Sequence, residues 1–534
     1  MTTTQRWTMV AAILGSSVVF LDGTIVNVAL PKIGETLPAT LVSVLEGQTY
    51  VASGYLATLA ALLILAGAVA DYYGRRRVFA IGLAGFGITS MLCAFAPNLE
   101  LLSLFRVLQG ATGALLVPGS LSIITATFDG EARARSFGIW AASTSGLLLF
   151  GPIIGGVLVT AVSWRAAFFI NAPLVILGLW ATLRHMEETR DESATGRFDW
   201  LGACVAVVAV GGLAFGAIRG EAQHWGDLTA FGALGIGAVA TLGFPFLMTR
   251  RPNPLVPLEL FRSRVFTVIN VSTLLIYGAL YVSVYFQTLF LQGVLGYTPV
   301  ASGMIGVPTG ILLTVLSTRI GALAGRIGPR PFLVAGPLVM AAGLLWMARI
   351  PSNSPAWAAD IAEPASLVPP TGALLDVLPS VLAFGVGISL VVAPLTSALM
   401  SSVAVRFAGV ASAINNAVSR VGSPLMSAII FIVVSGTFYS TLAAKVPGVD
   451  PASPELRQMV QPINPPKPDT PQEVREAGRA ASTDAFHVAS IACAALLVAG
   501  AAVNYVGLRG EPRDALPGEG PAAGDPDPGS AGQA

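Results

Sequence analysis

Charged residues, lysine, histidine and cysteine are all scarce in this chain of 534 residues. Only 11% of the residues are charged and 54% are hydrophobic, whereas a soluble globular protein carries about 25% charged residues. A soluble fold cannot bury that much apolar surface, so the composition excludes an ordinary soluble protein. The formal charge of +1 and the three lysines provide no basic surface, and we expect no nucleic-acid partner.

The three cysteines, Cys93, Cys204 and Cys493, each lie inside an apolar run. No second cysteine or histidine stands at ligand spacing, so we interpret them as buried small hydrophobic residues and expect no metal, disulfide or cofactor. The sequence also lacks the H-E-x-x-H, nucleophile-elbow, P-loop and dinucleotide-binding motifs. We therefore do not expect an enzyme.

Long apolar runs dominate the sequence instead. A bilayer core about 30 Å thick needs roughly 20 apolar residues in a helix, because lipid cannot hydrogen-bond exposed backbone groups. The pattern predicts an all-α polytopic membrane protein. Its fourteen predicted spans are 8–30, 49–70, 78–96, 100–125, 136–161, 166–184, 201–218, 228–248, 266–290, 302–324, 332–349, 374–398, 408–434 and 486–507.

Arginine placement predicts the orientation of these spans, because short cytoplasmic loops retain positive charge. The opposite loops, 97–100, 292–301 and 351–372, contain no lysine or arginine. Because the number of spans is even, both termini then lie in the cytoplasm. We predict a plasma-membrane protein and expect it to be a monomer. The arginines that mark the cytoplasmic side are Arg75, Arg76, Arg77, Arg133, Arg135, Arg250, Arg251, Arg262, Arg264, Arg326, Arg330 and Arg406.

An internal repeat predicts the domain organisation. Residues 67–82 recur in outline at 321–336, about half the chain further on. This separation indicates two six-helix bundles, 1–190 and 260–507, with an inserted central helix pair at 200–250. Parallel repeats of this kind place a substrate cavity at the midplane between the halves. The alternative is that Gly and Arg recur by chance in membrane loops.

Two segments are too polar or too rich in proline to be membrane spans. Clustered prolines within 437–484 predict a long external loop that ends in a short helix. Residues 510–534 consist mainly of Gly, Pro, Ala, Asp and Glu. They cannot bury enough apolar area to become ordered, so we predict a disordered cytoplasmic tail.

Asp22 is an acidic residue in the middle of the first predicted span. A carboxylate in hydrocarbon costs about 2.5–3.5 kcal/mol on insertion scales, so it should face a cavity or a partner. Burial disfavours the charged form of a carboxyl group, which makes Asp22 a candidate proton carrier. The alternative is that Asp22 and Asn27 only hydrogen-bond neighbouring helices.

Six motifs stand out along the spans. They are L-D-G-T-I-V-N-V-A-L-P from Leu21, G-A-V-A-D-Y-Y-G-R-R-R from Gly67, R-V-L-Q-G-A-T-G-A from Arg106, G-P-I-I-G-G from Gly151, W-R-A-A-F-F-I-N-A-P from Trp164, and the segment from Gly409 to Gly422. Together they resemble the major facilitator superfamily and, within it, the fourteen-helix drug–proton antiporter branch. The resemblance covers residues 8 to 507 and implies the major facilitator fold, two six-helix bundles plus two inserted helices. The branch usually has tryptophan where Tyr50 stands, which leaves the fold unaffected.

The resemblance implies roles for two of these motifs. The loop with Gly67, Asp71, Gly74, Arg75 and Arg76 is similar to the family's conformational latch. An anionic Asp71 can lie against the positive N-terminal end of a helix, and the span that starts near 408 is the candidate partner. The alternative treats these arginines purely as topology determinants.

The intramembrane arginine of the fourth span, Arg106, is implied to take part in proton coupling. A guanidinium stays protonated at ordinary pH, so Arg106 would stabilise the ionised form of a neighbouring carboxyl group rather than carry the proton. The alternative is that Arg106 extends to the membrane interface, since it lies near the external start of its span.

Gly151, Pro152, Gly155 and Gly156 resemble the fifth-helix motif of antiporters. Pro152 removes a backbone hydrogen bond, and small residues four apart allow helices to approach closely. We predict a bendable hinge in this span. Ordinary small-residue packing is the alternative.

Polar and aromatic positions in the spans predict a substrate cavity. Tyr277, Tyr281 and Tyr285 share one helical face and would accept amphipathic or cationic ligands by stacking. Plain helix packing is the alternative for these tyrosines. The other predicted cavity residues are Asn27, Gln109, Asn415 and Arg420.

These observations predict a proton-coupled antiporter that exports drug-like or secondary-metabolite compounds by alternating access, in exchange for protons. Two other functions stay open at this point. One is a membrane sensor or scaffold on the same fold, with loop 437–484 as a partner-binding element. The other is a nutrient importer or facilitator, against which the Gly-Pro motif argues.

Overall fold

The computed structural model describes residues 1–38, 44–190, 198–222, 227–360, 363–447, 449–450, 453, 456, 459–464 and 470–509. The predicted disordered tail, 510–534, lies outside them. The described part of the chain is almost entirely helical. Its α-helices are α1 (Thr3–Thr36), α2 (Val44–Tyr73), α3 (Arg75–Ala94), α4 (Leu99–Ala114), α5 (Leu116–Thr127), α6 (Gly130–Ala161), α7 (Ala166–Phe169), α8 (Asn171–His185), α9 (Trp200–Ala222), α10 (Leu228–Thr249), α11 (Arg264–Leu289), α12 (Pro299–Ile327), α13 (Arg330–Met347), α14 (Leu378–Ser401), α15 (Ala408–Lys445) and α17 (Gln472–Gly507).

Thirteen helical segments within the described residues are long and apolar enough to cross a membrane. A further helix, α6, is 32 residues long and coincides with the span predicted at 136–161. The all-α polytopic fold is confirmed, and these helices are consistent with the predicted count of fourteen spans. Two predicted spans are each built from two helices in series, α4 with α5 and α7 with α8.

The segment predicted as an external loop, 437–484, is helical at both of its ends. Helix α15 continues to Lys445, and α17 begins at Gln472. Buried side chains explain the longer helices, because Phe438 and Leu442 of α15 belong to the same apolar cluster as Val474 of α17. Buried apolar residues therefore continue along α15 beyond its predicted span, and along α17 they begin before its predicted span.

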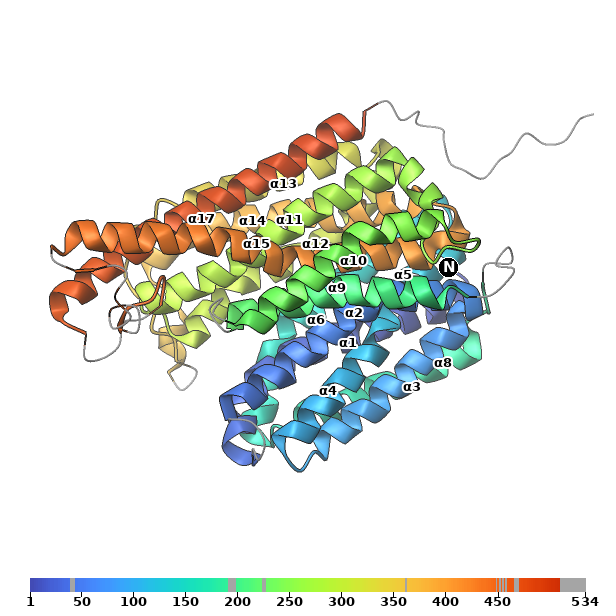
Figure 1. The fold of residues 1–534 in the computed structure, drawn as a ribbon, viewed down its shortest axis with the longest axis horizontal. Helices are drawn as coiled ribbons and strands as arrows, with labels where there is room; N and C mark the ends of the chain where they lie inside the picture. The colour runs from blue at the N-terminus through green and yellow to red at the C-terminus, as the bar shows by residue number, and fades with distance from the viewer. Residues whose placement is uncertain are drawn as a thin grey trace, which may run out of the picture.

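The helices form two groups (Figure 1), drawn in blue to teal for α1–α8 and in yellow-green to red for α11–α17. Helices α9 and α10 run side by side along one face of the molecule, and α9 contacts both α2 and α15. The inserted pair thus lies where the two groups meet. The start of α1 and the end of α17 lie at the same end of the molecule.

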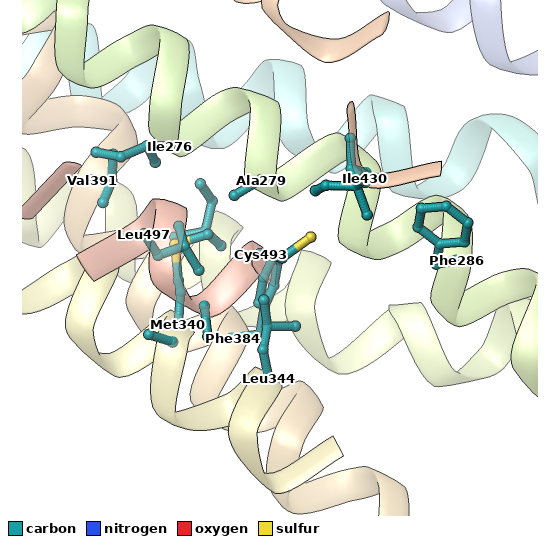
Figure 2. Close-up of a cluster of buried hydrophobic side chains, with 14 of the residues drawn as sticks. Ile276, Ala279, Phe286, Met340, Leu344, Phe384, Val391, Ile430, Cys493 and Leu497 are labelled. Atoms are coloured by element: carbon teal, nitrogen blue, oxygen red, sulfur yellow. The ribbon is translucent and has the colours of Figure 1, made fainter. Parts of the chain in front are cut away.

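Apolar side chains fill the interior of each group. In the second group, Figure 2 shows side chains from several helices converging in one cluster, including Ile276 of α11, Met340 of α13, Val391 of α14 and Leu497 of α17. Cys493 lies in this cluster and Cys93 is also buried, as predicted. The prediction was wrong for Cys204, which is exposed on α9, a helix packed against the bundles on only part of its surface.

Candidate functional site

The Asp22 carboxylate lies in α1 and is completely buried. Three side chains from two other helices donate hydrogen bonds to it. Arg106 Nη1 of α4 pairs with Oδ2. Gln109 Nε2 of α4 donates to Oδ1 at 3.0 Å, and Asn171 Nδ2 of α8 donates to the same oxygen at 3.0 Å. A buried charge is stable only when paired and hydrogen-bonded, and this arrangement meets both conditions.

Arg106 is held in a fixed position by α2. Its Nε donates to the Val51 carbonyl oxygen at 3.1 Å, and its Nη1 donates to Gln109 Oε1 at 2.8 Å. The guanidinium also stacks on the ring of Tyr55, with 4.0 Å to the ring centroid. Arg106 is 1% exposed, so it points into the first bundle and does not extend to the interface.

Gln109 was predicted to line a substrate cavity, and the structure places it in the Asp22 network instead. It is fully buried, and its Oε1 accepts bonds from Arg106 and, at 3.5 Å, from the Cys93 thiol. The amide group therefore bridges the two charged residues. Its position one helical turn after Arg106 explains this role, because residues three apart lie on the same helix face.

Asn171 lies in the W-R-A-A-F-F-I-N-A-P motif that starts at Trp164, but sequence reasoning assigned it no role in this network. Besides Asp22, its Nδ2 contacts Ser90 Oγ of α3 at 3.0 Å, and its own Oδ1 has no hydrogen-bond partner among the described residues. The available signal was that motif, with an amide side chain at the start of an apolar helix. That signal names no partner, since Asp22 lies 149 positions away.

A second charged cluster joins α2 to α15. Arg75 Nε and Nη2 donate to Asp71 Oδ1 at 2.9 and 2.8 Å. The other carboxylate oxygen accepts the Val410 N–H at 3.0 Å, in the first turn of α15. Arg75 also donates to the Val405 carbonyl oxygen. An aspartate thus caps the positive end of a helix from the other group, as the predicted latch requires.

Two glycines of the predicted latch occupy positions where a side chain does not fit. A Cβ on Gly67 would overlap the Gly409 carbonyl oxygen and lie 2.6 Å from the Ala413 Cβ. Gly74 has a φ of 112°, a conformation that favours glycine. Both glycines serve the geometry that brings Asp71 and Arg75 to α15.

Glu188, which follows α8, caps the helix that begins with Arg75. Its carboxylate accepts the Arg76 N–H at 3.0 Å and the Arg77 N–H at 3.2 Å. The Arg76 side chain in turn donates to the Leu183 carbonyl oxygen at 2.6 Å. Sequence reasoning missed Glu188, because a lone glutamate after a span does not indicate which helix it caps.

The glycines of the predicted hinge lie within α6, which is helical from 130 to 161. A Cβ on Gly151 would overlap Thr24, and one on Gly155 would lie 3.2 Å from the Cα of Ile25. Both contacts are on α1, two and three residues after Asp22. Helices α1 and α6 therefore approach closely at these glycines. The bending of α6 at Pro152 and Gly156 stays a prediction.

The other predicted cavity residues lie in different surroundings. Asn27 is exposed, as are Tyr281 and Tyr285 at 46% each, while Tyr277 packs near Tyr281 with ring centroids 6.2 Å apart. The last two predicted cavity residues, Asn415 and Arg420, lie on α15. Asn415 Nδ2 donates to Thr273 Oγ1 of α11 at 2.9 Å. The Nε atom of Arg420 is buried and has no hydrogen-bond partner among the described residues.

Comparison with known proteins agrees with this architecture. Residues 12–427 match the family model described as Major Facilitator Superfamily. Multidrug resistance protein Stp of Mycobacterium tuberculosis is 33% identical over 83% of this chain and 78% of its own length. The tetracenomycin C resistance and export protein of Streptomyces glaucescens is 33% identical over 80% of this chain and 76% of its own.

Solved structures show the same fold. The human organic anion transporter MFSD10 has a TM-score of 0.58 at 14% identity, covering 94% of this chain and all of its own. The fold and these relatives define a multi-pass membrane transporter. The chain belongs to the major facilitator superfamily.

Proposed function

We propose that this protein is a proton-coupled antiporter that exports drug-like or secondary-metabolite compounds by alternating access. The observation that carries the proposal is the fully buried pair of Asp22 and Arg106 inside membrane helices. Ionisable residues at such positions are costly and typically mark proton or substrate pathways. The printed names of the relatives, multidrug resistance and tetracenomycin C export, support the substrate class.

Proton binding at Asp22 acts on this pair. A neutral Asp22 can still accept a hydrogen bond from Arg106 but loses the charge–charge attraction, so protonation changes the relative energies of the conformations that contain or lack the pair. Each charge that moves through the membrane potential supplies about 2.3 kcal/mol per 100 mV. This energy drives export when proton entry and substrate exit use alternate conformations.

The contacts between the two helix groups serve as the gate on the cytoplasmic side. We define the arginine-rich end as the end that carries Arg75, Arg326 and Arg406, and we assign it to the cytoplasm by the positive-inside rule. Here Asp71 caps α15, and Glu131 of α6 pairs with Arg326 of α12 at 2.9 Å. These contacts hold this end closed, and inward opening requires that they break.

The substrate path lies between the two groups in this proposal. Asn27, Tyr277, Tyr281, Tyr285, Asn415 and Arg420 are its candidate lining residues, and Gln109 acts in proton coupling instead. Stacking on tyrosines suits aromatic compounds. Export of aromatic antibiotics is therefore the first activity to test.

The test uses purified protein in vesicles with an imposed proton gradient. We expect the gradient to drive transport of tetracenomycin C or of another compound from an antibiotic panel. We expect Asp22→Asn to abolish gradient-driven transport, while substrate binding to the detergent-solubilised protein persists. The proposal is wrong if no panel compound moves, or if Asp22→Asn transports like the wild type.

A further inference from the structure

The described hydrogen bonds to the Asp22 carboxylate all run in one direction. Within the described residues, the three side chains that bind this carboxylate, Arg106, Gln109 and Asn171, all do so through donors. This arrangement satisfies an ionised carboxylate. A protonated Asp22 gains an O–H group, and a buried donor without an acceptor costs about 1–3 kcal/mol. Proton binding therefore needs an acceptor that the present arrangement does not offer.

Two amide groups stand close enough to supply that acceptor, and their other contacts distinguish them. The oxygen of Gln109 is already occupied, because it accepts from Arg106 at 2.8 Å and from Cys93 at 3.5 Å. The oxygen of Asn171 is buried and has no partner among the described residues. Asn171 is thus the group with unused acceptor capacity beside Asp22.

A rotation of the Asn171 amide exchanges its nitrogen and oxygen. After a half-turn about the terminal side-chain bond, Oδ1 takes the place of Nδ2, 3.0 Å from Asp22 Oδ1 and 3.0 Å from Ser90 Oγ. The amide oxygen then accepts the new O–H of Asp22. Arg106 keeps its contact with the other carboxylate oxygen, Oδ2.

We propose that Asn171 is a protonation-linked positioning residue, whose amide donates to Asp22 when it is ionised and rotates to accept from Asp22 when it is protonated. The inference rests on the proposed function and adds a residue of α8 to the proton site. One proton binds Asp22 Oδ1 and later leaves it, and no other covalent bond to hydrogen forms or breaks. Ser90, which donates to the Phe168 carbonyl oxygen at 2.9 Å, accepts from the amide in the ionised state.

The charged and titratable groups around this site come from four helices. Arg106 of α4 pairs with Asp22, Tyr55 of α2 lies under the guanidinium, and Cys93 of α3 contacts Gln109. Arg420 of α15 is a further charged group near Tyr55. The Tyr55 hydroxyl donates to the Val19 carbonyl oxygen at 2.9 Å, so its proton is hydrogen-bonded to the backbone of α1.

Infrared difference spectroscopy between high and low pH tests the proposal on the purified full-length protein, without any transported compound. Asparagine labelled with heavy carbon at the side-chain carbonyl marks the amide bands, and the band lost in Asn171→Leu belongs to Asn171. If Asn171→Leu does not fold, Asn171→Ser provides the assignment. The carboxylic-acid band lost in Asp22→Asn reports protonation of Asp22.

We expect the Asn171 carbonyl band to move to lower frequency when the Asp22 acid band rises, and to return when that band falls. A downward shift means that the carbonyl has accepted a hydrogen bond. If the Asp22 band rises and the Asn171 band stays or moves upward, the role of Asn171 is overturned while proton coupling at Asp22 stands. If no Asp22 acid band forms at any pH at which the protein is folded, both proposals are overturned.

Discussion

Gly67 of α2 lies directly against the backbone of Gly409 in α15, so that the space of a Cβ on Gly67 is already filled by the Gly409 carbonyl oxygen. The contact joins the two halves of the molecule beside Asp71. Asp71, one helical turn after Gly67, accepts the Val410 N–H in the first turn of α15, so the glycine and the aspartate belong to one contact surface between the halves.

Gly67→Ala should therefore prevent closure of the arginine-rich end. The added methyl group forces α2 and α15 apart, and we expect efflux from vesicles to fall at least tenfold while each half stays folded. The matched control is Gly232→Ala on α10, where an added Cβ meets nothing within 4 Å. Wild-type efflux by Gly67→Ala would show that the close approach is not needed for transport.

Arg106→Lys should destabilise the protein although it keeps the positive charge. Lysine cannot reproduce the donors to Asp22, Val51 and Gln109, nor the stacking on Tyr55. Buried acceptors left unpaired cost about 1–3 kcal/mol, which thermal unfolding in detergent can detect. Arg135→Lys, at an exposed arginine of α6, is the control, and equal losses in both variants would contradict the expectation.

Glu188→Ala should weaken the start of α3 and, through Arg75, the latch. Loss of a helix N-cap costs about 0.5–2 kcal/mol, and we expect lower thermal stability together with slower efflux. Glu188→Gln keeps an acceptor without the charge and should fall between wild type and Glu188→Ala. The exposed neighbour Glu187, changed to alanine, should have no effect. An effect of Glu187→Ala as large as that of Glu188→Ala would refute the capping role.

Acidification should weaken the connection between α9 and α10 outside the membrane. Hydrogen bonds from the Thr229 hydroxyl and N–H, and then from Arg219, hold the pKa of Asp227 below its usual value. A lowered pKa in the folded state means stabilisation that is present at neutral pH and lost as the pH falls through that value. Thermal unfolding of the wild type at neutral and acidic pH measures this loss.

Thr229→Ala provides the comparison for that pH dependence. It removes the hydroxyl that donates to Asp227 at 2.6 Å, so less stability remains to be lost on acidification. We expect the difference in unfolding temperature between neutral and acidic pH to be smaller than in the wild type. A difference equal to that of the wild type would mean that Asp227 does not contribute.

The sequence predicts well those features that depend on neighbouring residues. Apolar runs identified the spans, and the G-x-x-x-D pattern at Gly67 and Asp71 indicated a contact with the helix that starts near 408. Asp22 and Arg106 were both named as proton-coupling residues, and the structure pairs them. Each of these inferences needed only a local motif and its likeness to a family.

The rest depends on which helices pack together, and a single sequence does not show that. Asn171 and Glu188 reach partners more than a hundred positions away, and neither lies in a pattern that names its partner. Gln109 was assigned to a cavity because it is polar and lies in a span. Asp22 packs against the face of α4 that carries both Arg106 and Gln109. Only this packing shows that Gln109 belongs to the charge network.

The length of α15 has a mechanical consequence. This helix of 38 residues is about 57 Å long at 1.5 Å per residue, roughly twice the bilayer core. Its first turn is the one that Asp71 caps, so a small tilt of the helix at that end is enlarged at its far end. A tilt of about 10° there would sweep the far tip sideways by about 10 Å, which transmits an event on one face of the membrane to the opposite face.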